Sequence, residues 1–76
     1  NKNEYRISIT AQRFVTLSLA DKSIRALYFD CHVYKKTEKF LEMKLWTAQE
    51  GTLKGQLVKC SLKKKFWPLI TIEAVN

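Results

Sequence analysis

Residues 57–75 read LVKCSLKKKFWPLITIEAV, and this stretch indicates the class of fold. Two short runs of aliphatic and β-branched residues, 57–62 and 69–75, enclose the segment KKKFWP. Such runs, bounded by breakers, are typical of β-strands. Pro68 suits the start of the second run, where a missing N–H does least harm to a sheet. The stretch therefore predicts two strands joined by a basic, aromatic connection.

The same alternation of apolar and polar residues runs through the rest of the chain. Period two is typical of half-buried strands, whereas a helix over residues 37–50 would place Lys44 beside the apolar side chains. Gln12 and Arg13 are expected to turn the chain, and residues 53–56 to form a short strand or a loop. Strands are predicted at residues 4–11, 15–19, 24–34, 40–46, 57–62 and 69–75.

Six to seven short strands without intervening helices predict an all-β fold. The architecture that fits best is an antiparallel β-sandwich, because the alternation of apolar and polar residues buries one face of each sheet and exposes the other to solvent. A small β-barrel is the alternative. The 76 residues suffice for one domain, residues 1–76. Because the chain begins with Asn1 and not Met, we expect a domain of a larger protein.

The chain carries a formal charge of +7, from 14 Lys and Arg against 7 Asp and Glu. Such a charge favours acidic partners, such as nucleic acid or an acidic protein face. A solvated basic surface that serves solubility is an equally weighted alternative. No apolar run approaches the ~18 residues of a membrane-spanning helix, and no membrane partner is expected.

The sequence carries no catalytic or metal-binding signature. Cys31 and His32 are adjacent, so a strand points them to opposite faces, where they cannot easily ligate one ion or form a nucleophile–base pair. Two glycines cannot supply a Gly-rich phosphate loop. We therefore expect a non-enzyme without metal, cofactor or small-molecule substrate. A small secreted domain usually carries more than two cysteines, so we expect this domain in the cytoplasm or nucleus. A single disulfide between Cys31 and Cys60 remains an alternative.

Basic residues interleaved with aromatic ones are the remaining candidates for function. Lysines and aromatic rings in one turn could bind phosphates and stack a base. The structural alternative is a solvated lysine turn whose two aromatic rings cap one end of the sandwich. The candidate binding residues are Lys54, Lys59, Lys63, Lys64, Lys65, Phe66 and Trp67. A second candidate patch, expected on outward faces, consists of Tyr28, His32, Tyr34 and Trp46.

Residues 15–19, a short turn, and then LYFDCHV at residues 27–33 follow one another in a characteristic order. A charged hairpin and FLEMKL at residues 40–45 come next, and LITIE at residues 69–73 comes last. This order resembles the CS domain family, the β-sandwich of small co-chaperones related to the α-crystallin fold. In a second register, LKKKFWPL at residues 62–69 resembles the closing segment of that family. The family's opening Trp-x-Gln and the lysine after its last strand are absent here.

The resemblance implies a protein-interaction module. Domains of this family act as adaptors or co-chaperones, and several bind the ninety-kilodalton heat-shock chaperone through one sheet face. Others are terminal domains of Tudor- and helicase-containing factors in the germline small-RNA (piRNA) pathway. We therefore expect a protein partner, either that chaperone or another domain or subunit of a parent complex. The alternatives are an RNA- or DNA-binding β domain and a structural or dimerising domain that pairs through sheet edges.

Overall fold

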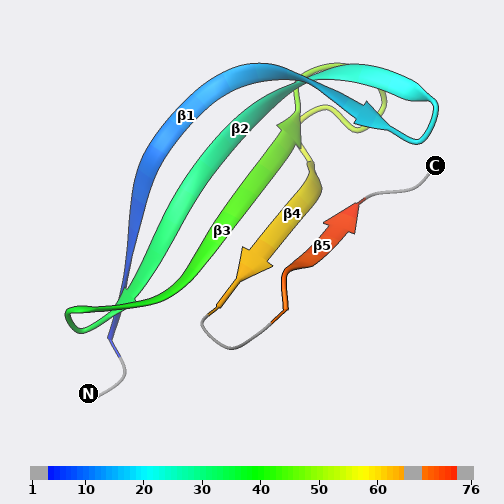
Figure 1. The fold of residues 1–76 in the computed structure, drawn as a ribbon. Helices are drawn as coiled ribbons and strands as arrows, with labels where there is room; N and C mark the ends of the chain where they lie inside the picture. Colours follow the sequence, from blue (N-terminus) through cyan, green and yellow to red (C-terminus); the bar gives the residue numbers. More distant parts are fainter. Residues whose placement is uncertain (1–3, 65–67, 74–76) are drawn as a thin grey trace.

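The computed structural model of the chain describes residues 4–64 and 68–73 as one antiparallel sheet (Figure 1). The strands follow one another in the sheet in the order of the sequence, so each connection joins neighbours. The predicted all-β, antiparallel class is confirmed. The strands are β1 (Tyr5–Leu19), β2 (Lys22–Lys35), β3 (Glu38–Ala48), β4 (Leu57–Lys63) and β5 (Ile70–Glu73).

The described residues form five strands, where the sequence predicted six to seven, and they form one layer where it predicted two. The turn predicted at Gln12 and Arg13 is wrong, because these residues lie inside β1 and pair with Phe29 and Tyr28 of β2. β2 is long enough to pair with β1 over its whole length, so the polar pair continues the strand. Residues 53–56 form turns and not a strand, with Gln56 N donating to Leu53 O over 2.9 Å.

A β-bulge at Thr10 explains why β1 is continuous although its pattern suggests two strands. The pairing of β1 with β2 shifts between Ile9 and Ala11, and the Thr10 hydroxyl donates to the carbonyl of Asp30 over 3.0 Å. One extra residue reverses the face on which the later residues lie. Ile9 and Leu17 therefore lie on opposite faces of the sheet although both positions are odd-numbered. The bulge gives one strand two apolar stripes on different faces.

A small core closes one end of the sheet. Its buried residues are Leu17, Leu19, Ala26, Ala48 and Val58, and Val15, Ile24, Trp46 and Leu53 pack against it. Alternation within residues 57–62 predicts that Val58 shares a face with Cys60 and Leu62. That prediction is wrong, because the pairing of β3 with β4 shifts between Trp46 and Thr47 and turns Val58 towards this core.

Residues 49–56 connect β3 to β4 and lie beside this core, with Leu53 packed against it. Gly55 N donates to Ala48 O and Gln49 N donates to Arg25 O, each over 2.8 Å. The Glu50 carboxylate also accepts a bond of 2.8 Å from the backbone N–H of Arg25. These bonds tie the connection to both β2 and β3, so the core end of the sheet is held from two sides. The rest of the sheet carries no such cover among the described residues.

Candidate interaction surfaces

The register of the sheet gathers apolar side chains from all five strands on one face. Directly opposed residues in antiparallel strands point to the same side. Cys31 pairs with Ile9 of β1 and with Met43 of β3. Met43 pairs in turn with Leu62, and Leu62 with Ile70, so one apolar row crosses the whole sheet. We call this side the apolar face; it comprises Ile7, Ile9, Phe14, Leu27, Phe29, Cys31, Val33, Leu41, Met43, Leu45, Cys60, Leu62, Ile70 and Ile72.

The apolar face is exposed mainly on its outer strands, while Cys31 and Val33 near its centre are buried. On the outer strands Ile7 is 61%, Ile9 57%, and Ile72 59% exposed. Cys31 is only 3% exposed, because the larger side chains of both neighbouring strands surround it. Soluble monomers rarely expose a contiguous apolar patch larger than a few hundred Å². The strongly exposed aliphatic side chains of this face lie on the outer strands, β1 and β5.

Charge is confined to the two ends of the apolar face. Arg25 lies at the core end, with its guanidinium carbon 5.0 Å from the centre of the Phe14 ring. Lys35, opposed to Tyr5, lies at the other end, as does Lys64, whose Nζ is 4.1 Å from the Phe40 ring that contacts Tyr5. Between the two ends, the paired residues of the described strands place no charged side chain on this face. The patch is thus apolar at its centre and basic at its ends.

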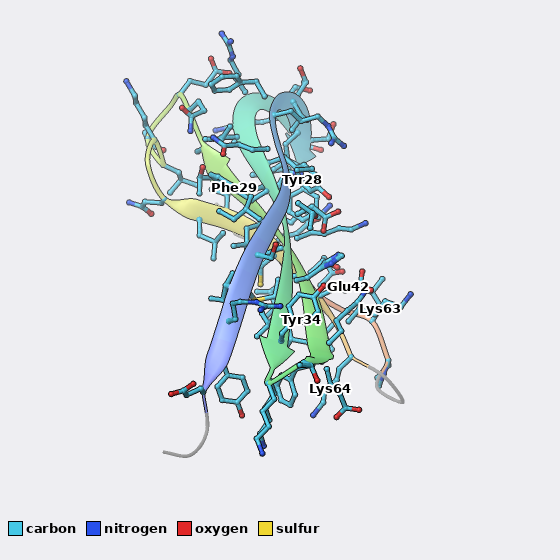
Figure 2. All side chains as sticks on the ribbon, turned by 90° about the vertical axis from the view of Figure 1, so that its left-hand side faces the viewer. Tyr28, Phe29, Tyr34, Glu42, Lys63 and Lys64 are labelled. Carbon is cyan, nitrogen blue, oxygen red and sulfur yellow. The ribbon has the colours of Figure 1, made fainter. Side chains whose placement is uncertain are left out.

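The opposite side, which we call the polar face, combines cations with aromatic rings. Alternation separates the two faces even between neighbours, as Tyr28 and Phe29 of β2 illustrate (Figure 2). Arg13 lies 4.6 Å from the Tyr28 ring centre, and Lys59 Nζ lies 5.0 Å from the Trp46 ring centre. The Tyr28 and Trp46 rings are themselves 5.0 Å apart. Cations at such distances interact favourably with the ring faces.

A shallow groove of about 440 Å³ follows this aromatic row. Its lining includes Arg13, Tyr28, Lys44, Trp46, Lys59 and Ser61. Lys59 also forms an ion pair with Glu73 of β5 over 3.1 Å. The groove is therefore basic along most of its length and aromatic at its floor.

Beyond the groove, Glu42 joins two basic residues. Its carboxylate lies 3.1 Å from Lys39 Nζ and 4.0 Å from His32 Nε2. The hydrogen bond from Lys39 is the main cause that lowers the pKa of Glu42. The positive charge of Lys63, which lies near Glu42 (Figure 2), also lowers this pKa. In Cys31, by contrast, burial raises the pKa of the thiol, and the neighbouring Asp30 adds to the rise.

The predicted binding lysines do not form one patch. Lys59 and Lys63 both lie on the polar face of β4, where they pair with Trp46 and Glu42. Lys54 lies in the connection before β4, so the length of this seven-residue strand, about 20 Å, separates it from Lys63. Lys64 follows the strand, with its Nζ 4.1 Å from the Phe40 ring centre. The remaining predicted residues, Lys65, Phe66 and Trp67, lie outside the described residues.

The residues of the second predicted patch share the polar face but form two separate pairs along β2. The Tyr28 and Trp46 rings are 5.0 Å apart, and the His32 and Tyr34 rings are 6.5 Å apart. Tyr28 is only 7% exposed, because Arg13 and Trp46 cover its ring. Sequence reasoning missed the apolar face as a site, since the expected second sheet would have covered it. The available signal was the alternation of Leu27, Phe29, Cys31 and Val33 in β2, and of Leu41, Met43 and Leu45 in β3, which places these apolar residues on one side of each strand.

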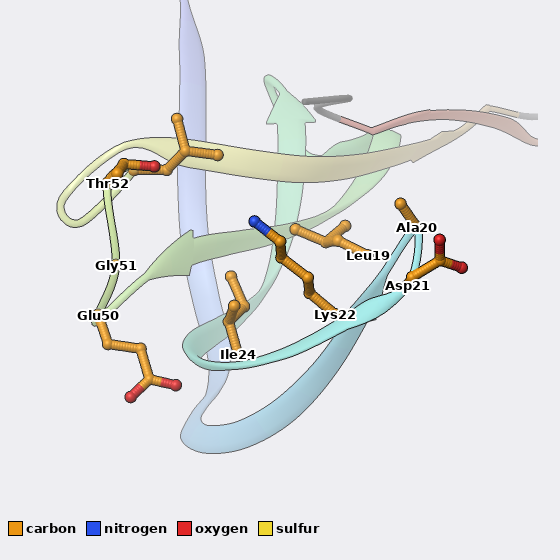
Figure 3. Close-up of a pocket in the computed structure, with 9 residues that line it drawn as sticks. Leu19, Ala20, Asp21, Lys22, Ile24, Glu50, Gly51 and Thr52 are labelled. Carbon is orange, nitrogen blue, oxygen red and sulfur yellow. The ribbon is translucent and has the colours of Figure 1, made fainter.

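A second cavity lies at the core end of the sheet and is too small for most ligands. It has a volume of about 180 Å³, and the β1–β2 turn and residues 50–53 line it (Figure 3). Ligand pockets usually span about 300–1,000 Å³. Within residues 4–64 and 68–73, no group of three or more His, Cys, Asp or Glu residues could hold a metal ion. Both cysteines are free.

No helix in the described part of the chain is long and apolar enough to cross a membrane. We found no match to the chain among protein-family models, curated proteins or solved structures.

Proposed function

We propose that the domain is a non-catalytic protein-interaction module that binds its partner through the apolar face. The observation that carries this proposal is the exposure of aliphatic side chains on a surface without central charge, with Ile7 61% and Ile72 59% exposed. A sheet of this kind is normally covered by a second layer. The partner would supply that layer, and the β-sandwich expected from the sequence would then arise on binding.

The energetics favour such a role. Complete burial of one aliphatic side chain contributes about 1.5–3 kcal/mol, so each residue that is now roughly 60% exposed, such as Ile9, would contribute on the order of 1 kcal/mol. Several such residues together can offset the cost of association. The likeness of the sequence to CS adaptors and co-chaperones supports the same class of function. A chaperone or another subunit of a parent complex is the kind of partner that this class implies.

The test is site-specific photocrosslinking with matched positions. A benzophenone amino acid replaces Ile72 on the apolar face or its neighbour Thr71 on the polar face, in the protein expressed in cells. We expect a discrete crosslinked protein from position 72 and none from position 71, and mass spectrometry of the product identifies the partner. Equal products from both positions, or none from position 72, would contradict the proposal.

A second candidate function is binding of single-stranded nucleic acid on the polar face. Arg13 over Tyr28, Lys59 over Trp46 and Arg6 over Tyr34, at 4.6–5.0 Å, together place cations beside aromatic rings along one surface. Basic grooves with aromatic floors bind single strands through phosphate contacts and base stacking. This candidate differs from the sequence-based one in its location, since it lies on the strands and not in the 63–67 connection.

The nucleic-acid candidate is tested by fluorescence anisotropy with labelled single-stranded RNA at several salt concentrations. Lys44→Gln in the groove is compared with Lys54→Gln in the distant connection, because both remove one positive charge. We expect only Lys44→Gln to weaken binding and to reduce the log–log salt slope by about 0.7. Equal effects of the two substitutions would indicate attraction by net charge alone.

A further inference from the structure

We propose that the partner on the apolar face is a second copy of this chain, packed sheet against sheet in a two-fold dimer. This inference rests on the proposed function and specifies its partner. The dimer would be a ten-stranded, two-layer sandwich whose interior is the pair of apolar faces. Each copy contributes one of the two sheets that the sequence pattern requires.

The size of the face fits a stable dimer. Four strands with about seven residues each on the paired length and the four-residue β5, about 4.8 Å apart and rising about 3.3 Å per residue, cover an outline of roughly 500 Å². This outline is of the same order as the ~800 Å² per partner that a standard interface buries. The largest exposed fractions lie on the outer strands, as for Ile9 and Ile72, whereas Cys31 and Val33 near the centre are 3% and 7% exposed. A second copy would therefore gain most from burying the outer strands.

The shape of the face also fits a copy of itself. Two sheets with the same right-handed twist pack face to face with their strands about 30° apart. A two-fold interface needs a surface that complements itself. A uniformly apolar centre meets this need because it contains no charged side chain that would require an opposite charge in the partner.

The charge of +7 on each copy does not prevent this packing. Arg13, Lys44 and Lys59 lie on the polar face and would point away from the partner. Packed sheets are about 10 Å apart, so the two outer faces would lie roughly 20 Å apart. Salt at physiological strength screens charges beyond about 8 Å, which leaves little repulsion across the sandwich.

Sedimentation equilibrium over a concentration series on the order of 1–200 µM tests the proposal, because dimerisation obeys mass action. The variants are Ile9→Glu and Ile72→Glu on the apolar face, with Ser8→Glu and Thr71→Glu as controls. Each control changes the neighbouring residue by the same charge on the polar face. We expect a wild-type dimer, with a dissociation constant raised about 100-fold or more by each apolar-face variant, because every dimer would bury two unpaired carboxylates. The controls should stay within about threefold of the wild type.

Circular dichroism separates loss of dimer from loss of fold. Ile9 is 57% exposed in the single chain, so the folded signal of Ile9→Glu should persist. A dimer that resists both apolar-face variants, or that Ser8→Glu disrupts equally, would overturn the proposal and place the interface elsewhere. If the dimer persists in both apolar-face variants and position 72 also gives no photocrosslink, the proposed protein-interaction function of the apolar face is overturned as well.

A wild-type monomer at every concentration would also overturn the dimer, and the neutral dye Nile red then distinguishes the two proposals. A monomer that binds the dye, with Ile9→Glu reducing binding and Ser8→Glu not, keeps an open face for a different protein. A monomer that does not bind the dye contradicts the interaction module as well.

Discussion

Replacement of Val58 tests whether the small core stabilises the sheet. Val58 is 2% exposed and packs with Leu17, Leu19, Ala26 and Ala48. Val58→Ala removes the equivalent of two methylene groups at about 0.8 kcal/mol each and leaves a cavity, for a total of about 2 kcal/mol. For a domain of this size the melting temperature should fall by about 8–16 °C.

The adjacent residue provides the control. Leu57 is larger but 53% exposed, so Leu57→Ala should cost less than about 1 kcal/mol although it removes more atoms. Urea unfolding followed by far-ultraviolet circular dichroism measures both free energies of unfolding. The variants are compared at one protein concentration in the Ile9→Glu background, so that association does not contribute. A cost for Val58→Ala no greater than that for Leu57→Ala would refute the placement of Val58 in the core.

Three further predictions concern the β1–β2 turn and the titratable groups. Ala20 has φ +52°, so Ala20→Gly should stabilise the domain by about 0.5–1 kcal/mol, measured by urea unfolding, and a loss of stability would contradict the turn geometry. Lys39→Met should raise the pKa of Glu42 measured by NMR, because Lys39 lowers that pKa in the wild type. The wild type should therefore be more stable than the variant at pH values above the ordinary pKa of 4.5. This difference in the free energy of unfolding should disappear as the pH falls and Glu42 becomes protonated. In the Ile9→Glu protein at pH about 8, iodoacetamide should modify Cys60 about tenfold faster than Cys31, which is 3% exposed and has a raised pKa; equal rates in the mass spectrum would exclude this difference.

Local patterns were sufficient to predict the antiparallel class and most strands, because alternation and polar turns are properties of short segments. These patterns did not predict the continuous strand through residues 10–13. Apolar residues occupy odd-numbered positions both before and after the polar pair Gln12 and Arg13. That pattern is what two strands joined by a turn would show. A bulge at Thr10 produces it equally well, and only the continuous pairing with β2 distinguishes the two. No glycine marks the bulge in the sequence.

The candidate surfaces were harder to predict because they depend on register between strands. The lysines and aromatic residues at 63–67 attracted attention as neighbours in the chain. The contacts of Arg13 with Tyr28 and of Lys59 with Trp46 join residues that are far apart in sequence, and they follow from strand pairing. Alternation likewise predicts an apolar side for each strand, but it does not say whether the same chain supplies the second layer.

Charged side chains are distributed unequally between the two faces of the sheet. A one-residue slip of β3 or β4 would put lysines such as Lys44 or Lys59 on the apolar face, so the register keeps these charges on the opposite side. In the proposed dimer, the two basic grooves lie on opposite outer surfaces, each with its own aromatic row. Covering the apolar face therefore leaves the groove residues Arg13, Lys44 and Lys59 free to meet an acidic ligand. The two proposed functions would use different sides of one sheet, so substitutions on one face can test each proposal without affecting the other.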